Sequence, residues 1–188
     1  MKLSLSMKKA SKMNVKLQEA KDSIRDIVDF PKEGILFKDI TTMLKDEKHL
    51  NTLVESLYKQ YKDKGITKVV GLESRGFILG TVLAYKLGAG FVPVRKPGKL
   101  PAPTFSEKYS LEYGEDEMFI HQDALNAEDI ILVHDDLLAT GGTAKASINL
   151  INKFKVKNVF INFLVELDFL NGREKLNTSY QVDSLFHF

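Results

Sequence analysis

One segment, residues 130–144, constrains the fold of this 188-residue chain more strongly than any other. It starts with four apolar residues, which are followed by a histidine and two adjacent acids, Asp135 and Asp136. A turn of small residues comes next, and the pattern predicts a helix over residues 143–154. Strands that are apolar throughout are buried on both faces, as parallel sheets require. The segment therefore predicts a strand, a turn and a helix of an α/β protein.

The rest of the sequence repeats this alternation of apolar runs and helical periodicity. It predicts strands over residues 68–72, 91–94, 130–133 and 159–165, helices over 13–27, 46–63 and 74–87, and an antiparallel hairpin from 109–113 and 118–121. Four of the five prolines fall within residues 93–103, so residues 95–108 are expected to be irregular. Strand–helix–strand repeats with short links build a mostly parallel sheet flanked by helices.

Charge and composition argue against several classes of protein. The net charge of +2 combines +5 from the lysines of residues 1–16 with −3 from the remainder, so the folded body is mildly acidic. A nucleic-acid-binding protein should carry its basic residues on a folded face. The most apolar long stretch, residues 76–94, contains Lys86 and Pro93, which argues against a membrane span. The absence of cysteine excludes disulfides and thiolate metal sites, and it matches a reducing cytoplasm.

The turn at residues 139–143 has the chemistry of a phosphate site. In open α/β sheets ligands bind at the carboxyl ends of the strands, and a helix N-terminus offers free N–H groups and partial positive charge. Gly141 and Gly142 let the backbone approach an anion, and the carboxylates of Asp135 and Asp136 suit two vicinal hydroxyls or a hydrated metal. The spacing matches neither GxxxxGK[ST] nor GxGxxG. An ordinary capped turn with two solvated aspartates is the structural alternative.

Four more motifs accompany this turn. They are FPKEGILFKDI at residues 30–40, GLESRGF at 71–77, RKPGKLP at 95–101 and YSLEYG at 109–114. Together with the acidic segment they resemble the type I phosphoribosyltransferases, whose signature binds phosphoribosyl pyrophosphate (PRPP). The motifs stand in the family's order, and the resemblance runs from about residue 30 to residue 176. Within the family, the chain is most similar to the members that act on adenine.

The resemblance implies a fold and a reaction. The type I phosphoribosyltransferase fold has a central, mostly parallel sheet, a small hood at residues 30–40 and a flexible hairpin arm at about 95–121. Residues 26–188 are expected to form this single domain, after a basic tail and helix at 1–25. The implied reaction joins adenine to PRPP and gives AMP and pyrophosphate. Its Mg²⁺ is expected to be held by PRPP oxygens and water rather than by protein side chains. The expected assembly is a cytoplasmic homodimer, with no nucleic acid or membrane as partner.

The resemblance also implies a role for individual residues. Glu112, on the hairpin arm, is the expected catalytic group that manages a purine proton. The ribose and its 5-phosphate are assigned to Asp135, Asp136, Ala139, Thr140, Gly141, Gly142 and Thr143. Pyrophosphate is assigned to Glu73, Ser74, Arg75, Lys96 and Lys99, with a cis peptide bond between Glu73 and Ser74. Adenine is assigned to Leu36, Phe37, Lys38 and Leu137.

Two other functions stay open on the sequence alone. One is a phosphoribosyltransferase for another nucleobase, although the hoods and loops of such enzymes differ from residues 30–40 and 109–114. The other is a PRPP-sensing regulator of the same fold, which would need a basic folded face or an added DNA-binding module. His134 stands where the family usually has an aliphatic residue, so it either perturbs the acids or packs as a neutral histidine. Arg95 has either a structural or an intersubunit role.

Overall fold

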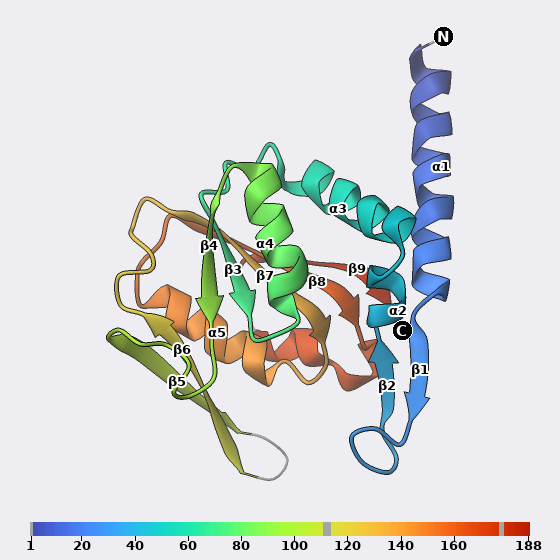
Figure 1. The fold of residues 1–188 in the computed structure, drawn as a ribbon. Helices are drawn as coiled ribbons and strands as arrows, with labels where there is room; N and C mark the ends of the chain where they lie inside the picture. The colour runs from blue at the N-terminus through green and yellow to red at the C-terminus, as the bar shows by residue number, and fades with distance from the viewer. Residues whose placement is uncertain (1, 111–113, 177–178) are drawn as a thin grey trace. The chain divides into compact units, whose positions relative to one another are not determined.

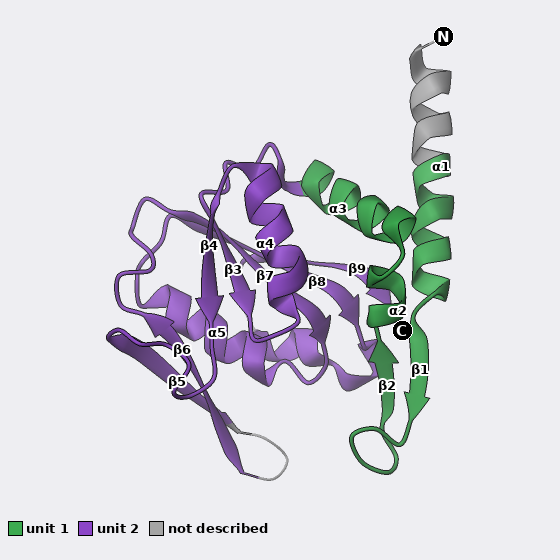
Figure 2. Cartoon of the chain, viewed as in Figure 1, with its two compact units in different colours: residues 1–60 green, residues 61–188 purple. Residues whose placement is uncertain are grey.

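The computed structural model describes residues 2–110, 114–176 and 179–188, with the backbone alone for residues 2–11 and Ser110 (Figure 1). The chain divides into two compact units, residues 1–60 and residues 61–188 (Figure 2). That residues 26–188 form one domain stays a prediction. Among the described residues, no helix has both the length and the apolar character that crossing a membrane requires.

The first unit consists of a long helix, a hairpin and two further helices. Its elements are α1 (Lys2–Asp22), β1 (Arg25–Val28), β2 (Leu36–Asp39), α2 (Thr41–Leu44) and α3 (Glu47–Tyr61), whose last residue begins the second unit. The predicted helix over 46–63 is confirmed as α3. The N-terminal helix is confirmed up to Asp22, but its predicted continuation to Ile27 is wrong, because residues 25–28 form β1.

The reason for this error lies in the partner strand. β1 pairs antiparallel with β2, and Arg25 is opposite Asp39 while Asp26 is opposite Lys38. Both pairs carry opposite charges: Arg25 Nη2 lies 2.5 Å from Asp39 Oδ2, and Lys38 Nζ lies 2.7 Å from Asp26 Oδ1. Cross-strand charge pairs of this kind stabilise a hairpin. Their partners lie more than ten residues away, so a local helical period could not reveal them.

The second unit is built on a parallel sheet. Its strands are β3 (Lys68–Leu72), β4 (Gly90–Val94), β7 (Ile130–Leu138), β8 (Asn158–Glu166) and β9 (Gln181–His187), in the order β4-β3-β7-β8-β9 with every pairing parallel (Figure 1). Its helices are α4 (Gly76–Leu87), α5 (Gly142–Asn152) and the 3-10 turns η1 (Asp168–Leu170) and η2 (Gly172–Leu176). An antiparallel hairpin, β5 (Thr104–Ser110) and β6 (Glu115–His121), forms the arm. The predicted α/β class with a mostly parallel sheet is confirmed.

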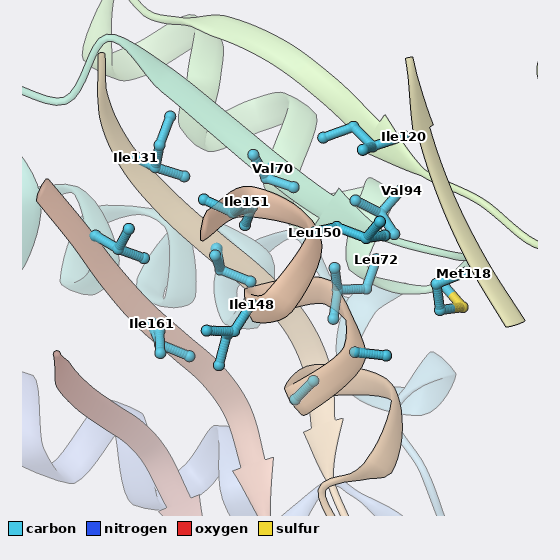
Figure 3. Close-up of a cluster of buried hydrophobic side chains, with 14 of the residues drawn as sticks. Val70, Leu72, Val94, Met118, Ile120, Ile131, Ile148, Leu150, Ile151 and Ile161 are labelled. Atoms are coloured by element: carbon cyan, nitrogen blue, oxygen red, sulfur yellow. The ribbon is translucent and has the colours of Figure 1, made fainter. Parts of the chain in front are cut away.

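The main hydrophobic core lies between this sheet and α5. Figure 3 shows Ile148 and Ile151 of α5 beside Val70, Leu72 and Ile131 of the sheet, all of them buried. Each such side chain contributes roughly 1.5–3 kcal/mol when it leaves water. Because side chains alternate along a strand, the residues between them face the other side of the sheet, where α4 packs. Both helices are thereby fixed against the strands that carry the candidate site.

Two elements differ from prediction in this unit. β7 runs on through Leu138 instead of ending before the acids, because Asp135 pairs with Phe163 and Leu137 with Val165 of β8. β5 begins at Thr104, inside the segment that was expected to be irregular, because it pairs with β6 from Thr104 opposite His121 onward. β9, where no strand was predicted, covers the outer edge of β8.

Candidate active site

The two acids lie near the carboxyl end of β7, in the middle of the parallel sheet. Asp136 is only 5% exposed, and Asp135 is half-buried. Burial raises the pKa of Asp135 well above its usual range, and the charge of Asp136 raises it further. Burial also raises the pKa of Asp136, although the Arg75 guanidinium opposes this effect. The pair is therefore costly to ionise without a ligand.

The turn between β3 and α4 brings Arg75 to these acids. Arg75 Nε lies 2.9 Å from Asp136 Oδ2 as an ion pair, but this oxygen receives no aligned hydrogen bond from any described residue. The peptide bond between Glu73 and Ser74 is cis, as the resemblance implied. A Cβ on Gly76 would lie 2.7 Å from the carbonyl oxygen of His134, so only glycine lets α4 start this close to β7.

The predicted phosphate turn follows β7 directly. Gly141 has φ of +80°, a conformation that residues with a Cβ rarely adopt, and α5 begins at Gly142. The free N–H groups of this 11-residue helix point back toward the strand end. Thr143 stands in its first turn, and Thr140 is exposed. The geometry thus places the assigned 5-phosphate residues in one continuous turn beside the acids.

Sequence analysis missed a residue that supports this turn from behind. A Cβ on Gly172, the first residue of η2, would overlap the carbonyl oxygen of Ala139 and lie 3.0 Å from the backbone nitrogen of Gly141. The backbone of η2 therefore packs directly on the phosphate turn. The only local signal was the Asn-Gly pair at residues 171–172, which indicates a turn but not its neighbour.

The carboxylate of Glu73, which was assigned to pyrophosphate, accepts its hydrogen bonds from residues of this chain. Arg95 approaches with Nε 3.1 Å from Oε2 and Nη2 3.3 Å from Oε1, and the backbone N–H of Lys96 donates to Oε2 at 2.7 Å. The Arg95 hydrogen bonds hold the pKa of Glu73 below its usual value. This arrangement fixes the 95–99 segment beside the β3–α4 turn and gives Arg95 a structural role within its own chain. Lys99 is exposed.

Lys96 meets the arm. Its Nζ forms an ion pair with Asp116 and donates a hydrogen bond of 2.7 Å to the Tyr109 hydroxyl. That hydroxyl lies 3.1 Å from Asp116 Oδ2 and 3.1 Å from Thr143 Oγ1. One phenol therefore links the assigned pyrophosphate lysine to the phosphate turn, a connection that sequence analysis did not foresee.

The assigned adenine residues belong to both units. Leu36, Phe37 and Lys38 form β2 of the first unit, whereas Leu137 lies on β7 of the second. Phe37 packs edge-on against Phe30, with 5.1 Å between ring centroids. Leu36 is 45% exposed. Glu112, the assigned catalytic residue, lies outside the described residues.

The side chain of His134 is directed to the neighbouring strand β8. It is fully buried, and its Nδ1 lies 2.9 Å from the side-chain oxygen of Asn162 on β8. Because an amide oxygen only accepts, His134 carries its proton on Nδ1. Burial lowers the pKa of His134 to about 4, so the ring is neutral at neutral pH. The histidine acts here as a packed, hydrogen-bonded link between two strands.

Another buried carboxylate, that of Glu166, stands at the end of β8. Glu166 receives Arg173 Nε at 2.9 Å and Nη2 at 2.5 Å, and the Ser184 hydroxyl at 2.5 Å. The Arg173 hydrogen bonds hold the pKa of Glu166 below its usual value. Asp168 and His187 lie close enough to complete a three-ligand set. Arg173 already supplies the positive charge that a metal would bring, so this cluster is a structural ion pair.

Comparison with known proteins agrees with this geometry. Residues 38–186 match the family model described as the phosphoribosyl transferase domain. The adenine phosphoribosyltransferase of Bacteroides fragilis is 58% identical over 161 residues, which cover 86% of this chain and 90% of the relative. The solved adenine phosphoribosyltransferase of Rhodothermus marinus has 47% identity and a TM-score of 0.88, over 93% of this chain and 99% of that one. The enzyme of Giardia lamblia, solved with 9-deazaadenine, has 41% identity and a TM-score of 0.88, over 92% and 97%. The chain therefore belongs to the phosphoribosyltransferase family, among its adenine phosphoribosyltransferases.

Proposed function

We propose that this chain transfers the phosphoribosyl group of PRPP to adenine and releases AMP and pyrophosphate. One observation carries the proposal: Asp135 and Asp136, Arg75 and the phosphate turn meet at the carboxyl edge of one sheet. Relatives that are more than half identical carry the name of this activity. The yeast enzyme, 40% identical, was solved with adenine and an imino-altritol bisphosphate.

The reaction breaks the bond between ribose C1 and a pyrophosphate oxygen and forms a bond from C1 to a purine nitrogen. Positive charge develops on the ribose ring while the leaving group becomes more negative. The carboxylates of Asp135 and Asp136 would accept hydrogen bonds from the ribose hydroxyls and stabilise that ring charge. Protein groups thus act by position and charge rather than as a nucleophile.

The 5-phosphate would bind the backbone N–H groups of the turn at 139–143, with the hydroxyls of Thr140 and Thr143 as further donors. Pyrophosphate would take the forked guanidinium of Arg75, which can serve an anion and Asp136 together. Lys96 and Lys99 lie on the segment that Glu73 fixes beside this turn. The carboxylate of Glu73 is directed to Arg95, so its contribution is to place the segment.

Mg²⁺ belongs to the proposal as a cofactor. The charge of the site fits it: two largely buried carboxylates whose pKa is raised stand beside the site of a highly anionic substrate, so a divalent cation would balance the charge. When bound, it would neutralise negative charge on the pyrophosphate. We assign it to PRPP oxygens and water, with no side chain as a direct ligand.

Adenine would be recognised by the β2 segment Leu36–Asp39, through the main chain of Leu36 and Lys38 and the ring of Phe37. The assignment of Leu137, on β7, stays a prediction. The exposed apolar surface of Leu36 and Phe30 is of the kind that a flat purine covers. Glu112 would take the proton that the purine nitrogen releases as the new bond forms.

The proposed assembly is a homodimer in the cytoplasm. α4 carries a stripe of exposed apolar side chains one and two turns apart, Ile78, Val82 and Tyr85, which suits a second copy of the chain. A chain without cysteine matches the reducing compartment.

A direct assay tests the function. Purified protein with Mg²⁺ and PRPP is supplied separately with adenine, hypoxanthine, guanine and orotate, and nucleotide and pyrophosphate formation are followed. We expect AMP from adenine and little product from the others. Product from another base alone would replace the assignment to adenine, and PRPP binding without any turnover would favour a sensor.

The role of Glu112 is tested by Glu112→Leu, with Glu115→Leu as the matched control, since Glu115 is an exposed residue of the same arm. We expect kcat to fall at least about tenfold in the first variant while PRPP affinity is largely retained. The control should keep normal turnover. Near-normal kcat in Glu112→Leu would remove the proton-handling role.

A further inference from the structure

The hydroxyl of Tyr109 is saturated with hydrogen bonds inside the protein. It accepts from Lys96 Nζ at 2.7 Å and from Thr143 Oγ1 at 3.1 Å, and it can donate its single proton to Asp116 Oδ2 at 3.1 Å. A phenol has one donor and two acceptor positions, so no capacity remains. The proton of the Thr143 hydroxyl is consumed in the same way.

Both ends of this network are residues that the proposed function needs for substrate. Thr143 lies in the turn assigned to the 5-phosphate, and Lys96 on the segment assigned to pyrophosphate. Lys96 also stands over the Tyr109 ring, 5.2 Å from its centroid, which adds a cation–π attraction. Burial alone would lower the pKa of Lys96, but the hydrogen bonds to Asp116 and Tyr109 outweigh it, so the ammonium is held charged.

The arm strand that carries Tyr109 is anchored along α5. Further from the helix start, Lys153 Nζ donates to the Ser106 carbonyl at 2.8 Å, and Asn149 donates to Glu107 at 3.0 Å. Tyr109 pairs across the hairpin with Asp116. The bond from Thr143 to Tyr109 is therefore the contact nearest the phosphate turn in a series of contacts along the helix, and it can open while the rest of β5 stays docked.

We infer that Tyr109 is a positioning residue that couples the two phosphate-binding ends of the site: a phosphate that takes the Thr143 hydroxyl releases Tyr109, and this release loosens the hold on Lys96. The inference rests on the proposed function and deepens it. Before substrate binds, the Thr143 donor is turned to Tyr109 and Lys96 to Asp116 and Tyr109. After the 5-phosphate binds, Tyr109 has lost its anchor on Thr143, so it holds Lys96 less firmly and Lys96 is freer to meet pyrophosphate.

The test measures this coupling by calorimetry. Sodium pyrophosphate is titrated, in buffer with MgCl₂, into the full chain with and without saturating ribose 5-phosphate. The ratio of the two dissociation constants for pyrophosphate also reflects the electrostatic repulsion between the two anions. This repulsion is the same in every variant, so it cancels when the ratios are compared. We expect ribose 5-phosphate to favour pyrophosphate binding about fivefold more in the wild type than in Tyr109→Phe. Tyr109→Phe should also bind pyrophosphate alone more tightly than the wild type does.

Two further variants complete the design. Tyr180→Phe is the matched control, because its hydroxyl donates a hydrogen bond of 2.9 Å to Asn152, a residue outside the network; it should keep the wild-type ratio. Asp116→Asn removes the ionic partner of Lys96, so pyrophosphate alone should bind about threefold more tightly. The thermal transition of each variant verifies that it folds.

The outcomes separate the two proposals. If both ligands bind the wild type and Tyr109→Phe keeps the wild-type ratio, the coupling is refuted while the proposed function stands. Weaker pyrophosphate binding in both Tyr109→Phe and Asp116→Asn would also refute it, since the network would then hold Lys96 in its binding position. If neither ligand binds the wild type, the proposed function itself fails and the coupling fails with it.

Discussion

Two neighbouring strands of one sheet end in buried carboxylates, and their electrostatics are opposite. At the end of β8, Glu166 is neutralised by Arg173 and accepts a further hydrogen bond from Ser184, and these hydrogen bonds lower its pKa. At the end of β7, burial raises the pKa of Asp135 and Asp136, and Arg75 offsets only part of this effect. The protein thus completes one site with its own groups and leaves the other short of positive charge.

The difference shows how a ligand site can be separated from a structural ion pair. A satisfied buried carboxylate stabilises the fold, whereas an unsatisfied pair holds free energy that a substrate or cation can recover on binding. The three-ligand arrangement around Glu166 has the outline of a metal site, but its partners are already in place. The hydrogen bonds that each carboxylate already receives from the protein, rather than the number of acids, distinguish the end of β7 from the end of β8.

The largest change in stability is expected when Arg173, the cation beside the end of β8, is removed. Arg173→Met should leave Glu166 buried without its partner and lower the free energy of unfolding by about 3 kcal/mol at pH 7. A pKa held below normal stabilises the protein above the unfolded value near 4.3, and this contribution disappears as pH falls through the folded pKa. The loss should therefore shrink on acidification, as urea unfolding at pH 7 and pH 4 can measure.

The control for that experiment is Lys175→Met, which removes an exposed cation from the same 3-10 turn. Its unfolding free energy should stay near that of the wild type. An Arg173→Met protein as stable as this control would mean that Glu166 finds other partners, and the contrast between the strand ends would lose its basis.

A smaller loss of stability is expected at Gly172, the residue before Arg173 in the chain. Gly172→Ala places a Cβ against the Ala139 carbonyl, so the phosphate turn must shift. We expect a loss of stability of about 2 kcal/mol and, with it, a rise in the KM for PRPP of about tenfold or more. Gly90→Ala is the comparison, since the three atoms nearest to a Cβ there all belong to the flexible side chain of Lys68. An unchanged KM in Gly172→Ala would show that η2 does not shape the turn.

The smallest change in stability is expected at Asp135, and there the substitution should stabilise the protein rather than destabilise it. Asp135→Asn removes a carboxyl whose pKa is raised, and we expect it to stabilise the protein by about 1 kcal/mol at pH 7 while turnover of PRPP collapses. A raised folded pKa destabilises the fold only above the unfolded value near 3.9, so the gain should vanish below about pH 4. Asp123→Asn, at an exposed loop position, should change neither quantity.

The prediction is tested by measuring the free energy of unfolding and the turnover of PRPP on the same preparation of Asp135→Asn. A variant that is less stable than the wild type at pH 7 would show that the acids contribute to the fold in the manner of Glu166. The two strand ends would then not differ in kind.

The sequence was informative wherever the cause of structure was local. The apolar run at residues 130–133 indicated a buried strand without any knowledge of its neighbours, and the helix over 46–63 was evident from its own periodicity. The two glycines after the acids indicated the phosphate turn for the same reason. These features depend on residues that are adjacent in the chain.

What could not be predicted depends on distant partners. β1 needs β2, and the acids lie inside β7 only because β8 continues beside them. The contact of Gly172 with Ala139 and the hydrogen bond from Thr143 to Tyr109 each join segments that are about thirty residues apart. No local pattern in the sequence indicates such contacts. The residues of the candidate site could therefore be proposed from the sequence, but the distant residues that pack against them could not.

The support that η2 gives to the phosphate turn bears on the synthesis of the protein. A growing chain that ends before residue 172 already contains both aspartates, the glycine turn and the following helix. It lacks the backbone of Gly172, against which that turn is set. If this turn binds the 5-phosphate as proposed, we expect capture of a phosphorylated sugar to begin only after residue 172 has left the ribosome, and a polypeptide terminated before it to bind the substrate poorly.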